Sequence, residues 1–243
     1  MAQLQFIGSG DAFGSGGRFQ ACILLSIGAD RVLLDCGATS LVAMKRAGVN
    51  PSEIGTVLLS HLHGDHFGGI PFLILDGQFS RRELPLLVAG PRGVKGRVEA
   101  AMEVFFPGSS AVERRFPVLF EEWEDRTTRD IGPVSVTPFE VDHASGAPAY
   151  ALRVSAGGKT IAYSGDTAWC GALVEAARGA DLFVAEAYMH TRQVKFHLDY
   201  ATLLRERAQL ECPRIILTHM SDDVLSQTTP EFERAEDGLI LTV

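Results

Sequence analysis

The 243-residue sequence lacks several features that would assign it to common classes of protein. No apolar run reaches the roughly 20 residues that a membrane-spanning helix needs, and the N-terminus lacks the charged-then-apolar order of a signal peptide. The four cysteines, Cys22, Cys36, Cys170 and Cys212, are scattered without CxxC spacing, so a structural zinc cluster of thiolates is not expected. We therefore expect a cytoplasmic protein with no membrane partner.

Positive charge is also scarce. Lysine and arginine number 22 against 30 aspartates and glutamates, for a net charge of -8, whereas a broad nucleic-acid surface is normally basic. Hydrophobic residues make up 46% of the chain, which is enough for a sizeable core. No long linker or low-complexity segment interrupts the sequence. We expect a single domain over residues 1–243, built of two similar halves.

Short apolar runs and amphipathic runs alternate along the chain. Apolar runs predict strands at residues 4–7, 21–27, 31–34, 57–59, 134–139, 149–154, 160–163, 182–185 and 214–217. Amphipathic runs predict helices at residues 40–47, 67–75, 94–106, 170–177 and 200–209. Strands followed by helices, twice over, indicate an α/β fold in which two sheets lie face to face with helices outside.

The densest chemical signal is a histidine-rich loop directly after the strand predicted at residues 57–59. His61, His63, Asp65 and His66 fall within six positions, although the chain has only seven histidines. Imidazole nitrogens and carboxylate oxygens are ligands that zinc and similar ions favour. If further ligands arrive from elsewhere, four such groups exceed what one tetrahedral ion needs. The pattern therefore indicates two ions.

Three more ligand-type residues follow predicted strands. His143 comes after Phe139–Asp142, Asp166 after Tyr163-Ser164-Gly165, and His219 after Ile215–Thr218. A single such residue is more often structural, because a strand-end histidine usually makes hydrogen bonds and an aspartate after glycine usually caps a turn. Together with the histidine-rich loop, however, the three predict one site at one edge of the sheets.

This series of ligands resembles that of the metallo-β-lactamase superfamily. The resemblance implies a four-layered αβ/βα sandwich with two metal ions at a sheet edge. Carried over residue by residue, it assigns His61, His63 and His143 to the first ion and Asp65, His66 and His219 to the second. Asp166 would bridge both ions.

A narrower resemblance is to ribonuclease Z and its small phosphodiesterase relatives. It rests on Phe6–Gly10, Asp35-Cys36-Gly37, Leu59–His66, Gly90–Gly93 and Ser164–Thr167. In that family a glutamate after an apolar strand pairs with a later histidine, and the segments 180–187 and 196–201 match these two motifs. The resemblance implies that Glu186 steadies His197, which would act as a proton donor or phosphate contact.

Two departures separate the chain from ribonuclease Z. The residue after Asp35-Cys36-Gly37 is Ala38, where the ribonuclease pattern usually has glutamate. Ribonuclease Z also typically has a long Gly- and Pro-rich arm that grips tRNA, and in several members it falls between the positions of His143 and Asp166. Only 22 residues lie between them here. The resemblance thus favours phosphodiester chemistry without the tRNA-gripping arm.

The expected function is that of a dinuclear-metal phosphodiesterase in which a metal-bridging hydroxide attacks phosphorus. Asp65 would orient or deprotonate the water, His197 would protonate the leaving alkoxide, and Asp35 would support a ligating histidine. The expected substrate is a small phosphodiester or a short nucleic acid. The alternatives are tRNA 3′-processing and hydrolysis of a lactone, thioester or β-lactam. Zinc is the first expectation for both ions, with manganese or iron as alternatives, and dimers in the resembled family suggest a homodimer.

Overall fold

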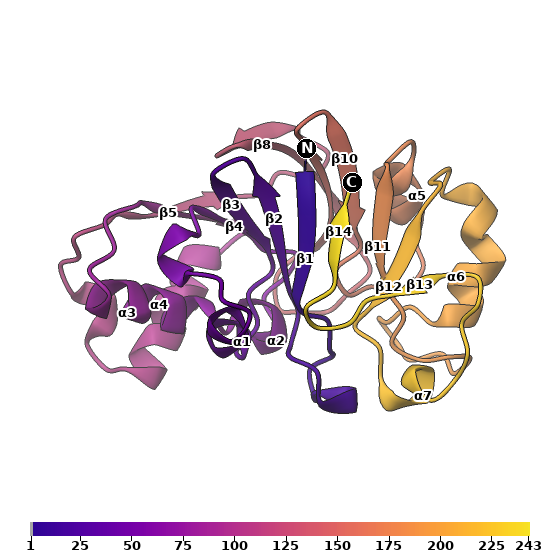
Figure 1. Cartoon of the computed structure of the whole chain (residues 1–243), viewed down its shortest axis with the longest axis horizontal. Coiled ribbons are helices and arrows are strands. Elements are labelled where there is room, and N and C mark those ends of the chain that lie inside the picture. The colour runs from indigo at the N-terminus through magenta and orange to yellow at the C-terminus, as the bar shows by residue number, and fades with distance from the viewer. Residues whose placement is uncertain (1) are drawn as a thin grey trace.

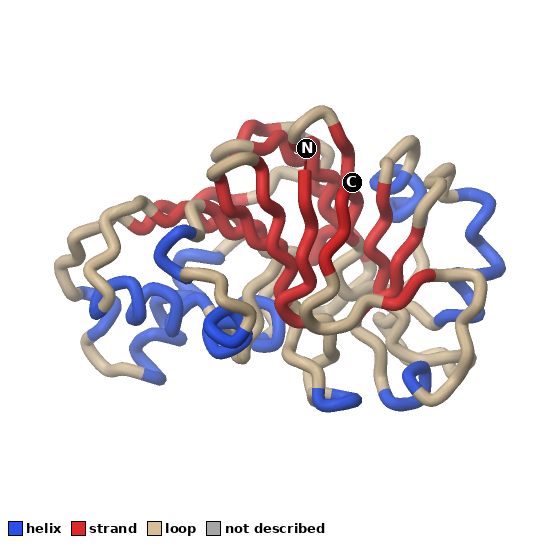
Figure 2. The backbone as a smooth tube through the Cα atoms, viewed as in Figure 1, coloured by secondary structure: helices blue, strands red, loops and turns tan. Residues whose placement is uncertain are grey.

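The computed structural model describes residues 2–243 as two seven-stranded sheets that lie face to face, with helices on their outer faces (Figure 1). This arrangement confirms the predicted αβ/βα sandwich. In Figure 2, the strands form the centre of the molecule and the helices lie at its two flanks and along its lower side. No helix within residues 2–243 combines the length and apolar character needed to cross a membrane.

The first sheet has the strand order β14-β1-β2-β3-β4-β5-β6. Antiparallel pairing joins β14, β1, β2 and β3, and parallel pairing joins β3 through β6. Its strands are β1 (Ala2–Gly8), β2 (Cys22–Ile27), β3 (Asp30–Leu34), β4 (Thr56–Leu58), β5 (Leu86–Gly90), β6 (Val118–Glu122) and β14 (Ile240–Thr242).

The second sheet repeats this mixture of pairings in the order β13-β12-β11-β10-β9-β8-β7. Strands β7 to β10 pair antiparallel, and β10 to β13 pair parallel. Its strands are β7 (Arg129–Ile131), β8 (Val134–Val141), β9 (Ala149–Ala156), β10 (Lys159–Tyr163), β11 (Leu182–Glu186), β12 (Ile215–Thr218) and β13 (Glu233–Arg234).

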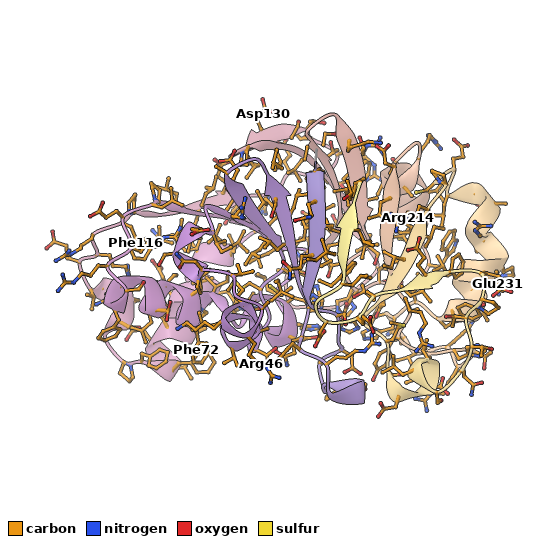
Figure 3. The ribbon with its side chains drawn as sticks, in the orientation of Figure 1. Arg46, Phe72, Phe116, Asp130, Arg214 and Glu231 are labelled. Atoms are coloured by element: carbon orange, nitrogen blue, oxygen red, sulfur yellow. The ribbon has the colours of Figure 1, made fainter. Side chains whose placement is uncertain are left out.

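Each sheet carries its own helices. The first is accompanied by α1 (Ser40–Arg46), α2 (Gly64–Phe67), α3 (Ile70–Phe79) and α4 (Val94–Phe105), and the second by α5 (Gly171–Ala177), α6 (Tyr200–Glu206) and α7 (Asp222–Leu225). Figure 3 shows Phe116, which packs with α3 and α4, and Arg214, which precedes β12, on opposite flanks of the molecule.

The four layers follow from the alternation of apolar side chains along each strand. In β2, Ile23 and Leu25 face the other sheet, whereas Cys22 and Leu24 face the helices. In β11, Val184 faces the first sheet, while its neighbours on the strand pack against the helices of the second. Strands buried on both faces read as continuous apolar runs, which is why these segments were recognisable in the sequence. The prediction of a single domain made of two similar halves is retained as a proposal.

The predicted elements match the observed ones except at a few places. The helix expected over residues 67–75 is two helices, α2 and α3, with Gly68 and Gly69 between them. Strands β5, β6, β7, β13 and β14 were not anticipated. In β6 the reason is visible, because its residues are at most partly buried and its carboxylates, Glu121 and Glu122, are typical of a solvated segment. Pairing with β5, which is remote in sequence, makes it a strand.

Candidate metal centre

The histidine-rich loop lies at the carboxyl end of β4, where the chain enters α2. His61 follows the last residue of the strand by three positions, and His63 directly precedes the helix. Asp65 and His66 lie in the first turn of α2. A strand end and one short helical turn therefore bring four ligand-type side chains together.

The other three predicted ligands reach the same place from the second sheet. His143 follows β8, Asp166 follows β10 and His219 directly follows β12. Figure 1 shows α2, which begins in the histidine-rich loop, and α7, which begins shortly after His219, along the same lower edge of the two sheets. The predicted meeting of strand ends is therefore what the fold produces.

Three histidines form the first group of potential ligands. One nitrogen from each of His61, His63 and His143 lies within 4.8 Å of the others. Nε2 of His143 is 3.0 Å from Nδ1 of His63. Burial, with like charge from neighbouring histidines, lowers the pKa of His61 well below its ordinary value, so this ring is a neutral imidazole with a lone pair to offer.

The second group combines two carboxylates with two histidines: Asp65, His66, Asp166 and His219. Nε2 of His66 lies 3.2 Å from Oδ1 of Asp166, and Nε2 of His219 lies 3.2 Å from Oδ2 of Asp65. Asp166 also faces the first group, because its Oδ2 is 3.9 Å from Nε2 of His61. It is the residue between the two groups.

The electrostatics of the second group are those of a buried anionic pocket. Burial alone would raise the pKa of Asp166, but His219 and His66 hold it well below its usual range. Burial alone would lower the pKa of His219, whereas Asp166, a hydrogen bond to Asp65 and the charge of Glu186 raise it to about 9. Closely packed carboxylates thus bind positive charge strongly at this point.

These residues fit a divalent cation. Among the described residues, Nε2 of His61 and Oδ1 of Asp166 are buried atoms without a hydrogen-bond partner. Such orphaned atoms are costly unless something else satisfies them. Imidazole nitrogens in one group and mixed nitrogen and oxygen donors in the other are the ligand sets of zinc, manganese and iron. The structure therefore supports binding of divalent metal.

A buried aspartate behind the histidines sets their orientation. Asp35 Oδ1 accepts a hydrogen bond from the Ser60 amide, and Oδ2 accepts from Ser60 Oγ, His66 Nδ1 and Tyr163 OH, all at 2.7 Å. Since Ser60 Oγ donates to Asp35, it can accept from Nδ1 of His61 at 3.0 Å. In both histidines Nδ1 carries the proton, and Nε2 is left to face the cluster.

Buried Glu186 and partly exposed His197 form a second arrangement beside the cluster. Glu186 ends β11 and is fully buried, and its Oε1 lies 2.5 Å from Nδ1 of His197. The amides of Thr167 and Leu198 donate to its Oε2 at 2.9 and 3.2 Å. Burial alone would lower the pKa of His197, but the hydrogen bond and charge of Glu186 raise it. His197 Nδ1 is also 4.0 Å from Asp166, so this pair borders the ligands.

Three residues at the site adopt the left-handed backbone region that favours glycine: Asp35 (φ 59°), Phe196 (φ 69°) and His219 (φ 54°). For residues with a side chain this conformation costs on the order of 1 kcal/mol or more each. Phe196 shows the benefit, because its carbonyl oxygen accepts a hydrogen bond from Nδ1 of His143 at 2.9 Å. That contact leaves Nε2 of His143 for the cluster.

The structure brings all nine predicted site residues to one edge of the sheets; their chemical roles stay predictions. The supporting network was largely missed from the sequence. Ser60 and Tyr163 lie beside the recognised motifs, but no pattern in the sequence predicts their hydrogen bonds. The carbonyl group of Phe196 belongs to the backbone, so its role cannot be predicted from the residue type. Asp35 and Tyr163 are 128 positions apart, so only the fold reveals their contact.

Two stacked mixed sheets with histidines and aspartates at a shared edge, together with the ribonuclease Z relatives given below, define a known class of protein, the metal-dependent hydrolases of the metallo-β-lactamase superfamily. Human tRNase Z, short form, has the same fold, with a TM-score of 0.81 and 22% identity over 99% of this chain and 98% of that one. The chain belongs to the family described as anti-Pycsar protein Apyc1, whose model matches residues 2–238.

Relatives of known sequence agree with this placement. Ribonuclease Z of Anoxybacillus flavithermus is 27% identical over 279 aligned positions, covering 90% of this chain and 86% of that protein. An uncharacterized protein of Mycobacterium leprae, ML1173, is 32% identical over 213 positions, covering 83% of this chain and 73% of that protein. The alignment with ribonuclease Z is longer than the 243-residue chain, so that enzyme has segments that this chain lacks. Between His143 and Asp166 this chain has only β9, β10 and their short connections.

Proposed function

We propose that the protein is a dinuclear-metal phosphodiesterase that hydrolyses small phosphodiesters. The observation that carries the proposal is the contact between buried Glu186 and partly exposed His197 beside two adjoining groups of potential metal ligands. Diester hydrolysis expels an alkoxide, which is a poor leaving group unless it receives a proton. A histidine held by a carboxylate at the border of the metal centre supports that role.

The residues that would hold the metal ions divide as the structure groups them. His61, His63 and His143 would bind one ion, Asp65, His66 and His219 the other, and Asp166 would contact both. When bound, the ions would lower the pKa of a water and neutralise charge on the phosphoryl oxygens. Zinc, a homodimer and a cytoplasmic location stay predictions from the sequence.

The protein's own side chains would move the protons. The carboxylate of Asp65 would accept a proton from the attacking water as the new P–O bond forms. His197 would donate the proton on Nε2 to the leaving oxygen as the old P–O bond breaks, while its Nδ1 stays bonded to Glu186. The reaction consumes one water and yields a phosphomonoester and an alcohol. Asp65 and His197 return to their starting states by exchange with solvent.

Two alternatives receive less support. tRNA processing would have to proceed without an arm between His143 and Asp166, on a protein whose net charge is -8. Hydrolysis of a thioester expels a thiolate, which hardly needs the proton that His197 could provide. Lactone and β-lactam hydrolysis belong to the same experiment. Turnover of such a substrate without turnover of a diester would replace the proposal.

The test is hydrolysis of bis(4-nitrophenyl) phosphate and of a 3′,5′-cyclic nucleotide by protein loaded with zinc or manganese. Asp65→Ala should abolish turnover of both substrates. His197→Ala should slow the cyclic nucleotide by about 10²–10⁴-fold but the nitrophenyl ester much less, because nitrophenolate leaves without a proton. His190→Ala is the matched control, since His190 stacks on Tyr200 outside the cluster. No turnover of either diester by fully loaded protein, with turnover of a lactone or thioester, would refute the proposal.

A further inference from the structure

A cavity of about 420 Å³ opens beside His197. One wall is the segment that follows Asp166 at the end of β10, including Trp169, and the other is the loop over residues 193–199. Asp142, next to His143, also lines it. The cavity therefore adjoins the metal centre on the side of the proposed proton donor, and its volume is within the range of small-ligand sites.

Two aromatic side chains, Trp169 and Phe196, line this cavity. Trp169 is half-buried, packed partly against the apolar cluster of the second sheet. Phe196 is held by its left-handed backbone and by the hydrogen bond from His143 to its carbonyl oxygen. Lys195 Nζ lies 4.5 Å from the centroid of the Phe196 ring, and Arg205 reaches the rim from α6. The lining thus combines two aromatic side chains with two cations and the carboxylates of Asp142 and Asp199, so that its formal charges balance.

A second cavity, of about 430 Å³, is lined in part by Tyr188 and differs in charge. Its lining includes Asp11, Asp222 and Asp223 against the single cation of Arg192, and the largely exposed Phe13. An anionic diester would be repelled by these carboxylates. The contrast favours the cavity at Trp169 for a group attached to phosphate.

We propose that the cavity at Trp169 binds the leaving group of the substrate, and that this group carries a flat aromatic ring. The inference rests on the proposed function, because a proton donor must reach the leaving oxygen, and the organic group on that oxygen then begins beside His197. Ring faces stack on indole without regard to the detailed pattern of hydrogen-bonding groups. The substrate class is a phosphodiester of an aromatic or nucleoside-type alcohol.

Competitive inhibition by two phosphomonoesters tests the site. Phenyl phosphate should inhibit hydrolysis of bis(4-nitrophenyl) phosphate about tenfold more strongly than methyl phosphate, as expected for one stacked ring. Trp169→Ala should bring this ratio close to one and raise KM more than it lowers kcat, whereas Trp169→Phe should keep most of the preference. Phe13→Ala is the matched control, since it removes an aromatic ring from the second cavity. An unchanged ratio in Trp169→Ala, or its loss in Phe13→Ala instead, would overturn the proposal.

Tryptophan fluorescence provides a readout that needs no turnover. The chain has two tryptophans, and Trp123 is buried with its indole N–H bonded to the Leu59 carbonyl oxygen. Titration of metal-loaded protein with 4-nitrophenyl phosphate should quench Trp169, and Trp169→Phe should remove the saturable quenching. Saturable quenching without hydrolysis of any diester would refute the proposed function and still support the ring site. Hydrolysis without saturable quenching would overturn the ring site alone.

Discussion

The two halves of the molecule contribute to the metal centre in opposite ways. The first sheet supplies four of the predicted ligands from one loop and one helical turn, His61 to His66. The second sheet supplies its residues singly, each from a different strand end or loop between positions 143 and 219. A contiguous cluster of ligand-type residues can be recognised in the sequence. Scattered residues form a site only because parallel strands end at a common edge of the sheet.

The comparison also shows that neither half holds its own ligands alone. Tyr163, from the second sheet, donates to Asp35 on the first, and Asp35 orients His66. In the reverse direction, Ser60 of the first sheet accepts a hydrogen bond at its carbonyl oxygen from Tyr150 on the second. The predictions below separate the contribution of each half.

The largest effect is expected where the two groups of ligands meet. Asp166→Ala removes the carboxylate that faces both groups, so we expect loss of bound metal and a fall in diester hydrolysis of well over 100-fold, beyond the range for outer partners of ligands. Metal content by elemental analysis, measured together with turnover, checks this. Asp130→Ala, an exposed aspartate at the opposite edge (Figure 3), should change neither quantity. Full metal content in Asp166→Ala would contradict the proposed role of Asp166 as a contact of both ions.

A smaller loss of activity is expected when the second sheet keeps its predicted ligands and His197 loses its carboxylate partner, Glu186. Glu186→Gln retains an oxygen for the Thr167 amide but removes the charge that faces His197, so hydrolysis of an alkyl phosphodiester should fall by about 10–100-fold. Metal content should not change. Comparison of the rate loss on alkyl and nitrophenyl esters is the measurement. Equal losses on both would show that Glu186 supports the metal site and not proton donation.

A third variant tests the support that one half gives to the other. Tyr163→Phe removes one of the donors to Asp35 without changing any ligand, and we expect metal affinity to fall by about tenfold, the lower end for outer partners of ligands. Competition with a chelator measures the affinity. Tyr200→Phe is the control, because its hydroxyl bonds to Glu231 away from the site. An unchanged affinity in Tyr163→Phe would mean that Ser60 suffices to hold Asp35.

Much of the fold and the chemical groups of the site could be predicted from the sequence. The strands that are buried on both faces, such as β2 and β11, are continuous apolar runs and were located within a few residues. Strand β6 was not found, because its partly exposed residues carry a charge pattern typical of loops. Its pairing with β5 depends on a contact between residues some 30 positions apart, for which local pattern gives no signal.

The same limit applies within the site. The ligand types and their order were readable because histidine is rare in this chain and dense in one loop. The hydrogen bonds that select which imidazole nitrogen faces the cluster were not readable, since they come from Ser60, Tyr163 and a backbone carbonyl. Residue identity predicts what can ligate, and only the packing of the two sheets determines which atom is presented.

The cysteines of the two halves should also differ in their reactivity toward a disulfide reagent. Of the predicted differences, this one has the smallest effect on function. Burial raises the pKa of Cys22 to about 12 and that of Cys36 well above its usual value, so these thiols stay protonated at neutral pH. Cys170 and Cys212 in the other half are only partly buried. A disulfide reagent at pH 8 should therefore label at most the second pair in folded protein, and all four after unfolding. Rapid labelling of Cys22 in native protein would show that the first sheet opens locally.

Strand β14 pairs with β1, so the last strand of the described chain completes the sheet that its first strand begins. During synthesis, the first sheet cannot acquire this edge until residues 240–242 have been made. The histidine-rich loop is produced earlier than all three of the ligand-type residues that join it, His143, Asp166 and His219. A growing chain therefore contains His61 to His66 before Asp166 and His219 exist, so the grouping of these side chains has to wait for the second sheet.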